Sequence, residues 1–155
     1  MKKILFVCHG NICRSVSAEF IFKHLIREYK LDKDFYSESR ATTREEIGND
    51  IYPPMKRTLI NNNIVVSKHY AKQITIQDYE SYDLILLMDK ENLYSIKRII
   101  PQDYLNKIYL LTEYVGIIGE IEDPWYSGRY EFVYNKIKEC IERLIEKLKN
   151  EDRIK

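Results

Sequence analysis

Three apolar runs limit the possible fold more than any other feature of this sequence. The runs are KILFVC at 3–8, YDLILLM at 82–88 and KIYLL at 107–111, and none of them alternates regularly between apolar and polar residues. A strand with apolar side chains on both faces is buried on both faces, which is typical of a parallel sheet covered by helices. We therefore expect the runs at 3–8 and 82–88 to be strands of an α/β fold that are buried on both faces, and the run at 107–111 to be a further strand of the same sheet.

The segments between the runs carry apolar residues at helical spacing. The pattern predicts helices over 15–29, 53–60, 90–99 and 129–149, and a more polar strand over 34–40. Glu19 is expected in the first turn of the first helix, where an acidic side chain suits the helix dipole. Alternating strands and helices predict a three-layer α/β sandwich, with a parallel sheet between helices on both faces.

The composition is that of an ordinary globular chain. The 155 residues, 45% hydrophobic and 32% charged, are expected to form one domain over residues 1–155. Lys and Arg number 25 against 24 Asp and Glu, so we expect no nucleic-acid partner and only a local anion site. No stretch reaches membrane-span length, and three cysteines without a secretory segment predict a cytoplasmic protein with reduced thiols.

The segment VCHGNICRS, residues 7–15, follows the first strand directly. Ligands of open parallel sheets bind beyond the carboxyl ends of the strands, so Cys8 stands where such a fold places its chemistry. A loop between a strand and a helix start directs backbone N–H groups at an anion. Gly10 permits close approach or a positive φ, Asn11 tolerates the left-handed region, and the Arg14 fork matches two phosphate oxygens.

The same groups favour the thiolate form of Cys8, which is a nucleophile suited to phosphorus. Ser15 is expected to cap the helix and to donate a hydrogen bond to the Cys8 sulfur. Two simpler interpretations exist: Cys8 is a small apolar residue that ends a strand, or Cys8, His9 and Cys13 bind a metal. The metal interpretation has no evident fourth ligand and no common zinc spacing.

With the loop and a second motif together, the sequence resembles the low-molecular-weight protein tyrosine phosphatases. VCHGNICRS is similar to the family signature, and EDPWYSG at 122–128 is similar to the family's Asp-Pro-aromatic-aromatic loop. The similarity extends over SAEF at 17–20, EIGN at 46–49, YDLILLMDKENL at 82–93 and the C-terminal helix. The resemblance implies a four-stranded parallel sheet in the order 2-1-3-4.

The resemblance also implies a reaction. Cys8 would attack the phosphoryl group of phosphotyrosine or a small aryl phosphate, Arg14 would clamp its oxygens, and Asp123 would act as general acid and then base. No metal or cofactor is expected. The partners implied are phosphotyrosine proteins or peptides, inorganic phosphate and other oxyanions, bound by a monomer or weak dimer. The implied phosphate-binding loop comprises His9, Gly10, Asn11, Ile12, Cys13 and Ser15.

Only the family match singles out Asp123, because Asp before Pro is a common turn opener and Glu122 competes for the acid role. Trp125 and Tyr126 are assigned to the pocket wall, although both also suit a core. The family's supporting network corresponds to Asn11, Ser15 and Ser39. His69 would complete it, but a histidine on a surface loop suits the sequence equally well, because the spacing from Ser67 is stretched by one residue.

Two positions depart from the family pattern at the pocket. His9 stands where many relatives have an apolar residue, and Glu45 stands near EIGN where some have an aromatic wall. An alternative is a protein-arginine phosphatase on the same scaffold. A thioredoxin-linked arsenate reductase is disfavoured, since no relay cysteines lie between Cys13 and Cys140. A catalytically inactive phosphate-binding module is disfavoured, because Cys8, Arg14 and Asp123 are all present.

The two remaining cysteines are expected to differ. Cys13 lies in the loop, where its sulfur would trap an oxidised Cys8 as a reversible disulfide. Cys140 falls on the apolar face of the last helix and is expected to be part of the core.

Overall fold

The computed structural model of the chain describes residues 1–154. Its four parallel strands are β1 (Lys2–Cys8), β2 (Phe35–Ala41), β3 (Leu84–Leu87) and β4 (Ile108–Leu110), in the order β2-β1-β3-β4. The helices are α1 (Arg14–Glu28), α2 (Pro53–Asn61), α3 (Ile76–Ser81), α4 (Lys90–Ile96), α5 (Leu111–Val115), α6 (Pro124–Ser127) and α7 (Tyr130–Ile154). The predicted α/β class and strand order are confirmed.

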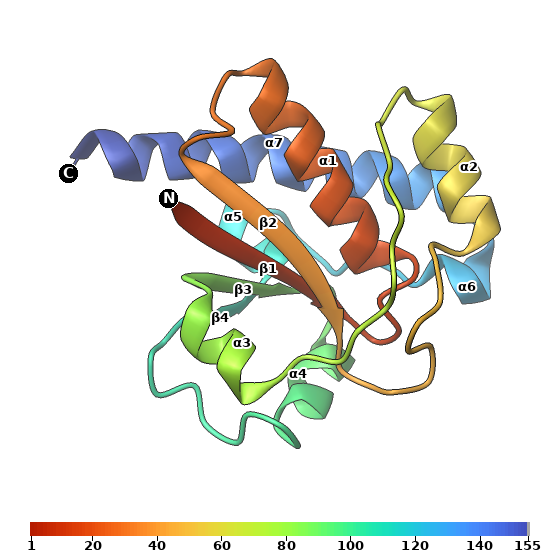
Figure 1. The fold of residues 1–155 in the computed structure, drawn as a ribbon, viewed down its shortest axis with the longest axis horizontal. Helices are drawn as coiled ribbons and strands as arrows, with labels where there is room; N and C mark the ends of the chain where they lie inside the picture. The colour runs from red at the N-terminus through yellow and green to blue at the C-terminus, as the bar shows by residue number, and fades with distance from the viewer. Residues whose placement is uncertain (155) are drawn as a thin grey trace.

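Helices cover both faces of the sheet, as predicted. Figure 1 shows α1, α2 and α7 on one face and α3 and α4 on the other. Successive residues of β1 supply both layers, because side chains alternate between the faces of a strand. Ile4, Phe6 and Cys8 belong to the larger apolar cluster, and Leu5 and Val7 belong to the smaller one.

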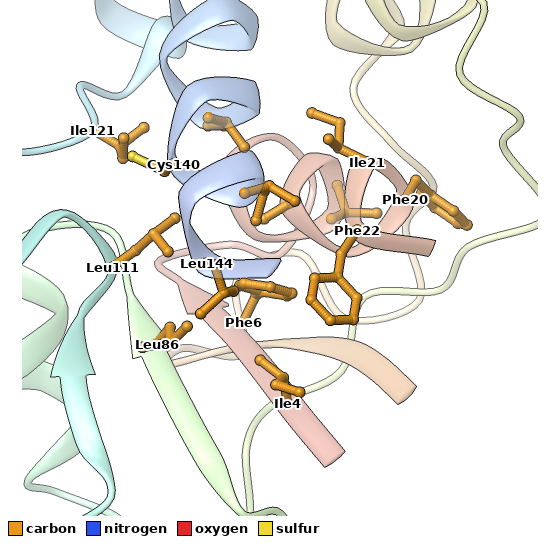
Figure 2. Close-up of a cluster of buried hydrophobic side chains, with 14 of the residues drawn as sticks. Ile4, Phe6, Phe20, Ile21, Phe22, Leu86, Leu111, Ile121, Cys140 and Leu144 are labelled. Atoms are coloured by element: carbon orange, nitrogen blue, oxygen red, sulfur yellow. The ribbon is translucent and has the colours of Figure 1, made fainter. Parts of the chain in front are cut away.

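The larger cluster fills the space between the sheet and the helices α1 and α7. Figure 2 shows Phe6, Phe22, Leu86, Leu111 and Leu144 gathered there. Cys140 is fully buried in the same cluster, as the apolar face of the last helix predicts. This layer holds α1, and therefore the loop before it, against the end of β1.

Three short helices were not predicted. α3 spans 6 residues, α5 spans 5 and α6 spans 4, too few for a helical period to be recognised. α3 begins at a capping box in which Thr75 and Asp78 satisfy each other's backbone N–H groups. Within residues 1–154, no helix has the length and apolar character needed to span a membrane.

The packing of α7 on the sheet predicts a large effect of truncating Leu144, which is fully buried. Leu144→Ala should lower the free energy of unfolding by about 3 kcal/mol, because the removed methyl groups leave a cavity. Leu105 is 50% exposed, so Leu105→Ala should change it by about 0.5 kcal/mol or less. Urea denaturation of both variants measures the difference, and equal effects would contradict this account of the core.

Candidate active site

The predicted loop lies at the carboxyl ends of neighbouring strands. β1 ends at Cys8, and Arg14 begins α1 after five loop residues. Cys8 is paired in register with Ala41 on β2, while β3 ends beside it and continues into Asp89. Strand order reverses between β1 and β3, which is where open parallel sheets bind ligands.

Asn11, and not Gly10, takes the left-handed conformation in this loop. The φ angle of Asn11 is 61°, and Gly10 is absent from the residues with positive φ. Gly10 instead provides room, because a Cβ at this position would lie 3.3 Å from Cγ of Glu46. The loop therefore needs a residue tolerant of positive φ at position 11 and a small residue at position 10.

The Cys8 sulfur receives donors from the first turn of α1. Sγ lies 3.0 Å from Oγ of Ser15 and 3.4 Å from the Ser15 backbone N–H. The prediction that Ser15 caps the helix is wrong: the N-cap residue is Cys13, with no side-chain capping bond. Ser15 lies one residue inside the helix, so its hydroxyl is directed at the sulfur and not at the helix end.

The Asn11 side chain holds the loop by three hydrogen bonds. Its Nδ2 donates to Oγ of Ser15 and to Oγ of Ser39, both at 2.9 Å, and its Oδ1 accepts from the Lys72 N–H at 3.2 Å. Since Ser15 accepts from Asn11, its own hydroxyl hydrogen is available to the Cys8 sulfur. The amide thus orients the hydroxyl that faces the candidate nucleophile.

Glu19 extends this network and was missed as part of the site. Ser39 Oγ donates to Glu19 Oε1 at 2.6 Å, and Glu19 is buried. The predicted first-turn position is wrong, because α1 begins at Arg14 and Glu19 is its sixth residue. A buried carboxylate needs partners, and here the Ser39 hydroxyl and Lys23 provide them.

His69 is buried beneath the loop and is not a surface histidine. Its Nε2 lies 2.6 Å from the carbonyl oxygen of Asn11, to which it donates. Burial lowers the pKa of His69 below its ordinary value, although the bond to Asn11 acts in the opposite direction. The neutral ring thus supports the residue with the left-handed backbone.

Arg14 is held in place by groups that the sequence did not indicate. Its Nη1 donates to Asp89 Oδ2 at 2.5 Å and to the Ile121 carbonyl at 3.0 Å. Burial acts to lower the pKa of Arg14, but the charges of Cys8 and Asp89 raise it above its ordinary value. The guanidinium is therefore cationic, and its two hydrogen bonds hold it in one orientation. Asp89 lies within the segment YDLILLMDKENL, and the resemblance of this segment to the family is the only feature of the sequence that could have pointed to Asp89.

The neighbouring carboxylates Asp123 and Glu122 contact different arginines. Asp123 is the N-cap of α6, accepts from the Trp125 N–H at 3.0 Å, and places Oδ2 3.6 Å from Nη2 of Arg14. Glu122 forms an ion pair with Arg129, and hydrogen bonds from Arg129 lower the pKa of Glu122 to about 2. Glu122 is therefore held by Arg129 and does not line the pocket that Cys8, Arg14 and Asp123 line.

Cys8, Arg14 and Asp123 line one cavity of about 190 Å³. The predicted wall residues Glu45, Trp125 and Tyr126 line it, together with Glu46, which was not predicted. Trp125 is 54% exposed and Tyr126 is 86% exposed, so neither is a core residue. The other lining residues are His9, Gly10, Ile12 and Cys13.

A hydrogen-bonded pair of side chains lies on one side of this pocket. His9 Nε2 lies 2.6 Å from Glu45 Oε2, which joins the phosphate-loop candidate to the segment after β2. Both side chains are substantially exposed.

Cys13, in contrast to His9, is buried. Its burial, and to a lesser extent the charge of Cys8, raises the pKa of Cys13 well above the ordinary value. Residues 1–154 contain no group of three or more His, Cys, Asp or Glu placed to hold a metal ion.

Comparison with known proteins identifies the family. The model of the family described as low molecular weight phosphotyrosine protein phosphatase matches residues 3–154. The chain is 38% identical to the protein of that name from Gallus gallus, with 95% of this chain and 96% of the relative covered. The chain therefore belongs to this family, as the two motifs predict, and it is an enzyme of this class.

Solved structures agree with this assignment. The crystal structure of YfkJ from Bacillus subtilis matches with a TM-score of 0.92 and 32% identity, covering 97% of this chain and 96% of YfkJ. The YwlE arginine phosphatase, from the same organism, matches with a TM-score of 0.87 and 27% identity over 99% of both chains. Its structure is that of a mutant with a phosphorylated active-site serine.

Substitution of Asn11 separates its two roles. Asn11→Ala places a β-carbon in the left-handed region and removes the network, whereas Asn11→Gly removes only the network. We expect Asn11→Ala to lower the free energy of unfolding by about 1 kcal/mol more than Asn11→Gly does. Urea denaturation measures this difference, and equal loss in the two variants would show that the backbone at position 11 is not strained by a side chain.

Proposed function

We propose that the enzyme hydrolyses phosphotyrosine in proteins or peptides, and small aryl phosphates, through a cysteinyl-phosphate intermediate on Cys8. The observation that carries this proposal is the convergence of the Cys8 sulfur, Arg14 and Asp123 on one pocket of about 190 Å³. Trp125 and Tyr126 offer aromatic surface beside the position of the phosphate.

In the first step, the Cys8 thiolate attacks phosphorus, an S–P bond forms and the bond from phosphorus to the phenolic oxygen breaks. Asp123 donates its proton to the departing oxygen. Arg14 and the backbone N–H groups of the loop stabilise the charge on the non-bridging oxygens. Because Asp89 and the Ile121 carbonyl hold one guanidinium nitrogen, the fork is oriented before substrate arrives.

In the second step, Asp123 accepts a proton from water as the water oxygen attacks phosphorus. The S–P bond breaks, inorganic phosphate forms and Cys8 leaves as a thiolate. The Ser15 hydroxyl, 3.0 Å from the sulfur, donates a hydrogen bond that stabilises this leaving group. Inorganic phosphate and similar oxyanions are therefore expected to bind the loop and to inhibit competitively.

The mechanism predicts distinct effects of three substitutions. Cys8→Ser should abolish turnover of an aryl phosphate while phosphate still binds, and Asp123→Ala should lower kcat roughly 10²–10⁴-fold through loss of the general acid. Glu122→Ala is the matched control and should retain most of the activity, because Glu122 is paired with Arg129 outside the pocket. Steady-state kinetics decides it, and a larger loss in Glu122→Ala than in Asp123→Ala would reassign the acid.

The carboxylates of Glu45 and Glu46 on the pocket wall support phosphoarginine as the second candidate substrate, because a guanidinium leaving group carries positive charge. The likeness to YwlE points the same way, whereas Trp125 and the named curated relatives favour phosphotyrosine.

We expect kcat/KM for a phosphotyrosine peptide to exceed that for the matched phosphoarginine peptide by at least about tenfold, a difference of about 1.4 kcal/mol. The rates should be unchanged by a chelator, because Arg14 and the loop amides supply the positive field. A preference for phosphoarginine would assign the enzyme to the other substrate.

A further inference from the structure

A groove separate from the proposed mechanism adjoins the active pocket. It has a volume of about 600 Å³ and runs along the start of α2. Ile12, Glu46 and Trp125 line both the groove and the active pocket, so the two cavities adjoin at these residues. The remaining lining residues are Asn49, Asp50, Ile51, Tyr52, Pro53, Lys56, Arg57 and Ile60.

The junction of groove and pocket is built from fixed groups. The Tyr52 N–H donates to the Ile12 carbonyl at 2.9 Å, which ties the start of α2 to the implied phosphate-binding loop. The Trp125 and Tyr52 rings pack against each other with their centroids 4.8 Å apart. The Tyr130 ring stacks on the Tyr52 ring with a centroid distance of 6.3 Å. A group bound in the groove would therefore be positioned relative to the Cys8 sulfur with little rearrangement.

The groove offers apolar surface and, among the residues that the structure describes, one cation that forms no ion pair. Ile60 is 52% exposed and Trp125 is 54% exposed, which is unusual for large apolar side chains facing a concavity. Lys56 pairs with Asp50 at 2.9 Å. Arg57, in the part of the chain that the structure describes, makes no ion pair or side-chain hydrogen bond. Glu46 lines both the groove and the active pocket, whereas Arg57 lines the groove but not the active pocket.

We propose that this groove is a subsite for the substrate residues that flank the phosphotyrosine, and that it selects an apolar side chain followed by an acidic one. The apolar residue would lie against Ile60, Pro53 and Trp125, and the acidic residue would pair with Arg57. This inference rests on the proposed function, because it assumes that a phosphotyrosine occupies the adjoining pocket. The charge of Arg57 and the three lining residues that the two cavities share support a peptide over a small molecule confined to the active pocket.

The test compares phosphotyrosine peptides in steady-state kinetics. One series places Leu and then Glu on the amino-terminal side of the phosphotyrosine, and a second places them on the carboxyl-terminal side. The reference peptides replace Leu by Ser, Glu by Lys, or both. Para-nitrophenyl phosphate, which has no flanking residues, reports on the active pocket alone. We expect kcat/KM for one of the Leu-Glu peptides to exceed that for its reference by about three- to tenfold.

Matched variants locate the effect. Arg57→Glu should remove or reverse the preference for Glu over Lys, and Ile60→Ser should reduce the preference for Leu. Arg98→Glu and Ile76→Ser are the controls, since Arg98 and Ile76 are also exposed but line neither cavity. All four variants should hydrolyse para-nitrophenyl phosphate at nearly the rate of the unsubstituted enzyme, which also shows that they are folded.

Two failures can be told apart. If the unsubstituted enzyme hydrolyses para-nitrophenyl phosphate but shows no preference among the peptides, or if Arg57→Glu and Arg98→Glu change the preference equally, the subsite is rejected and the proposed function stands. If the unsubstituted enzyme hydrolyses neither para-nitrophenyl phosphate nor any phosphotyrosine peptide, the proposed function is rejected and the subsite with it.

Discussion

The site depends on one side chain, the amide of Asn11. In the proposed reaction the loop wraps around the phosphate with its N–H groups directed inward, and the left-handed backbone of Asn11 suits such a turn. The amide then joins β2, through Ser39, to α1, through Ser15. Because every polar atom of the amide has a partner, the loop is held in one conformation, and the Ser15 hydroxyl is held against the Cys8 sulfur.

The carboxylates of Asp89 and Asp123 meet Arg14 because the fold brings distant segments together. Arg14 lies on α1, whereas Asp89 follows β3 and Asp123 caps α6. The neighbouring positions of β1 and β3 place Asp89 against the guanidinium. A buried cation between two carboxylates retains its charge, and its orientation is set before any ligand binds. In the proposed reaction, this arrangement supplies the positive field at the phosphate.

The long elements were predictable because their patterns are long. The apolar runs and the helical spacing of α1 and α7 correspond to the observed strands and helices, and the family resemblance supplied the sheet order. The errors concern single turns. Because α1 starts at Arg14, Ser15 does not cap the helix and keeps only its expected contact with the Cys8 sulfur, and Glu19 lies beyond the first turn, in the Ser39 network. Asp89 and Glu46 were missed, because their contacts join residues far apart in the sequence.

The sequence by itself determined the class of fold and the two motifs that carry the proposed chemistry, because apolar periodicity and a Cys-to-Arg spacing are local properties of the chain. Only the tertiary structure decided how neighbouring residues differ. Glu122 turns to Arg129 while Asp123 faces Arg14, and His69 lies buried under Asn11. Such choices follow from packing and hydrogen bonding between elements, which place groups many residues apart within about 3 Å of each other.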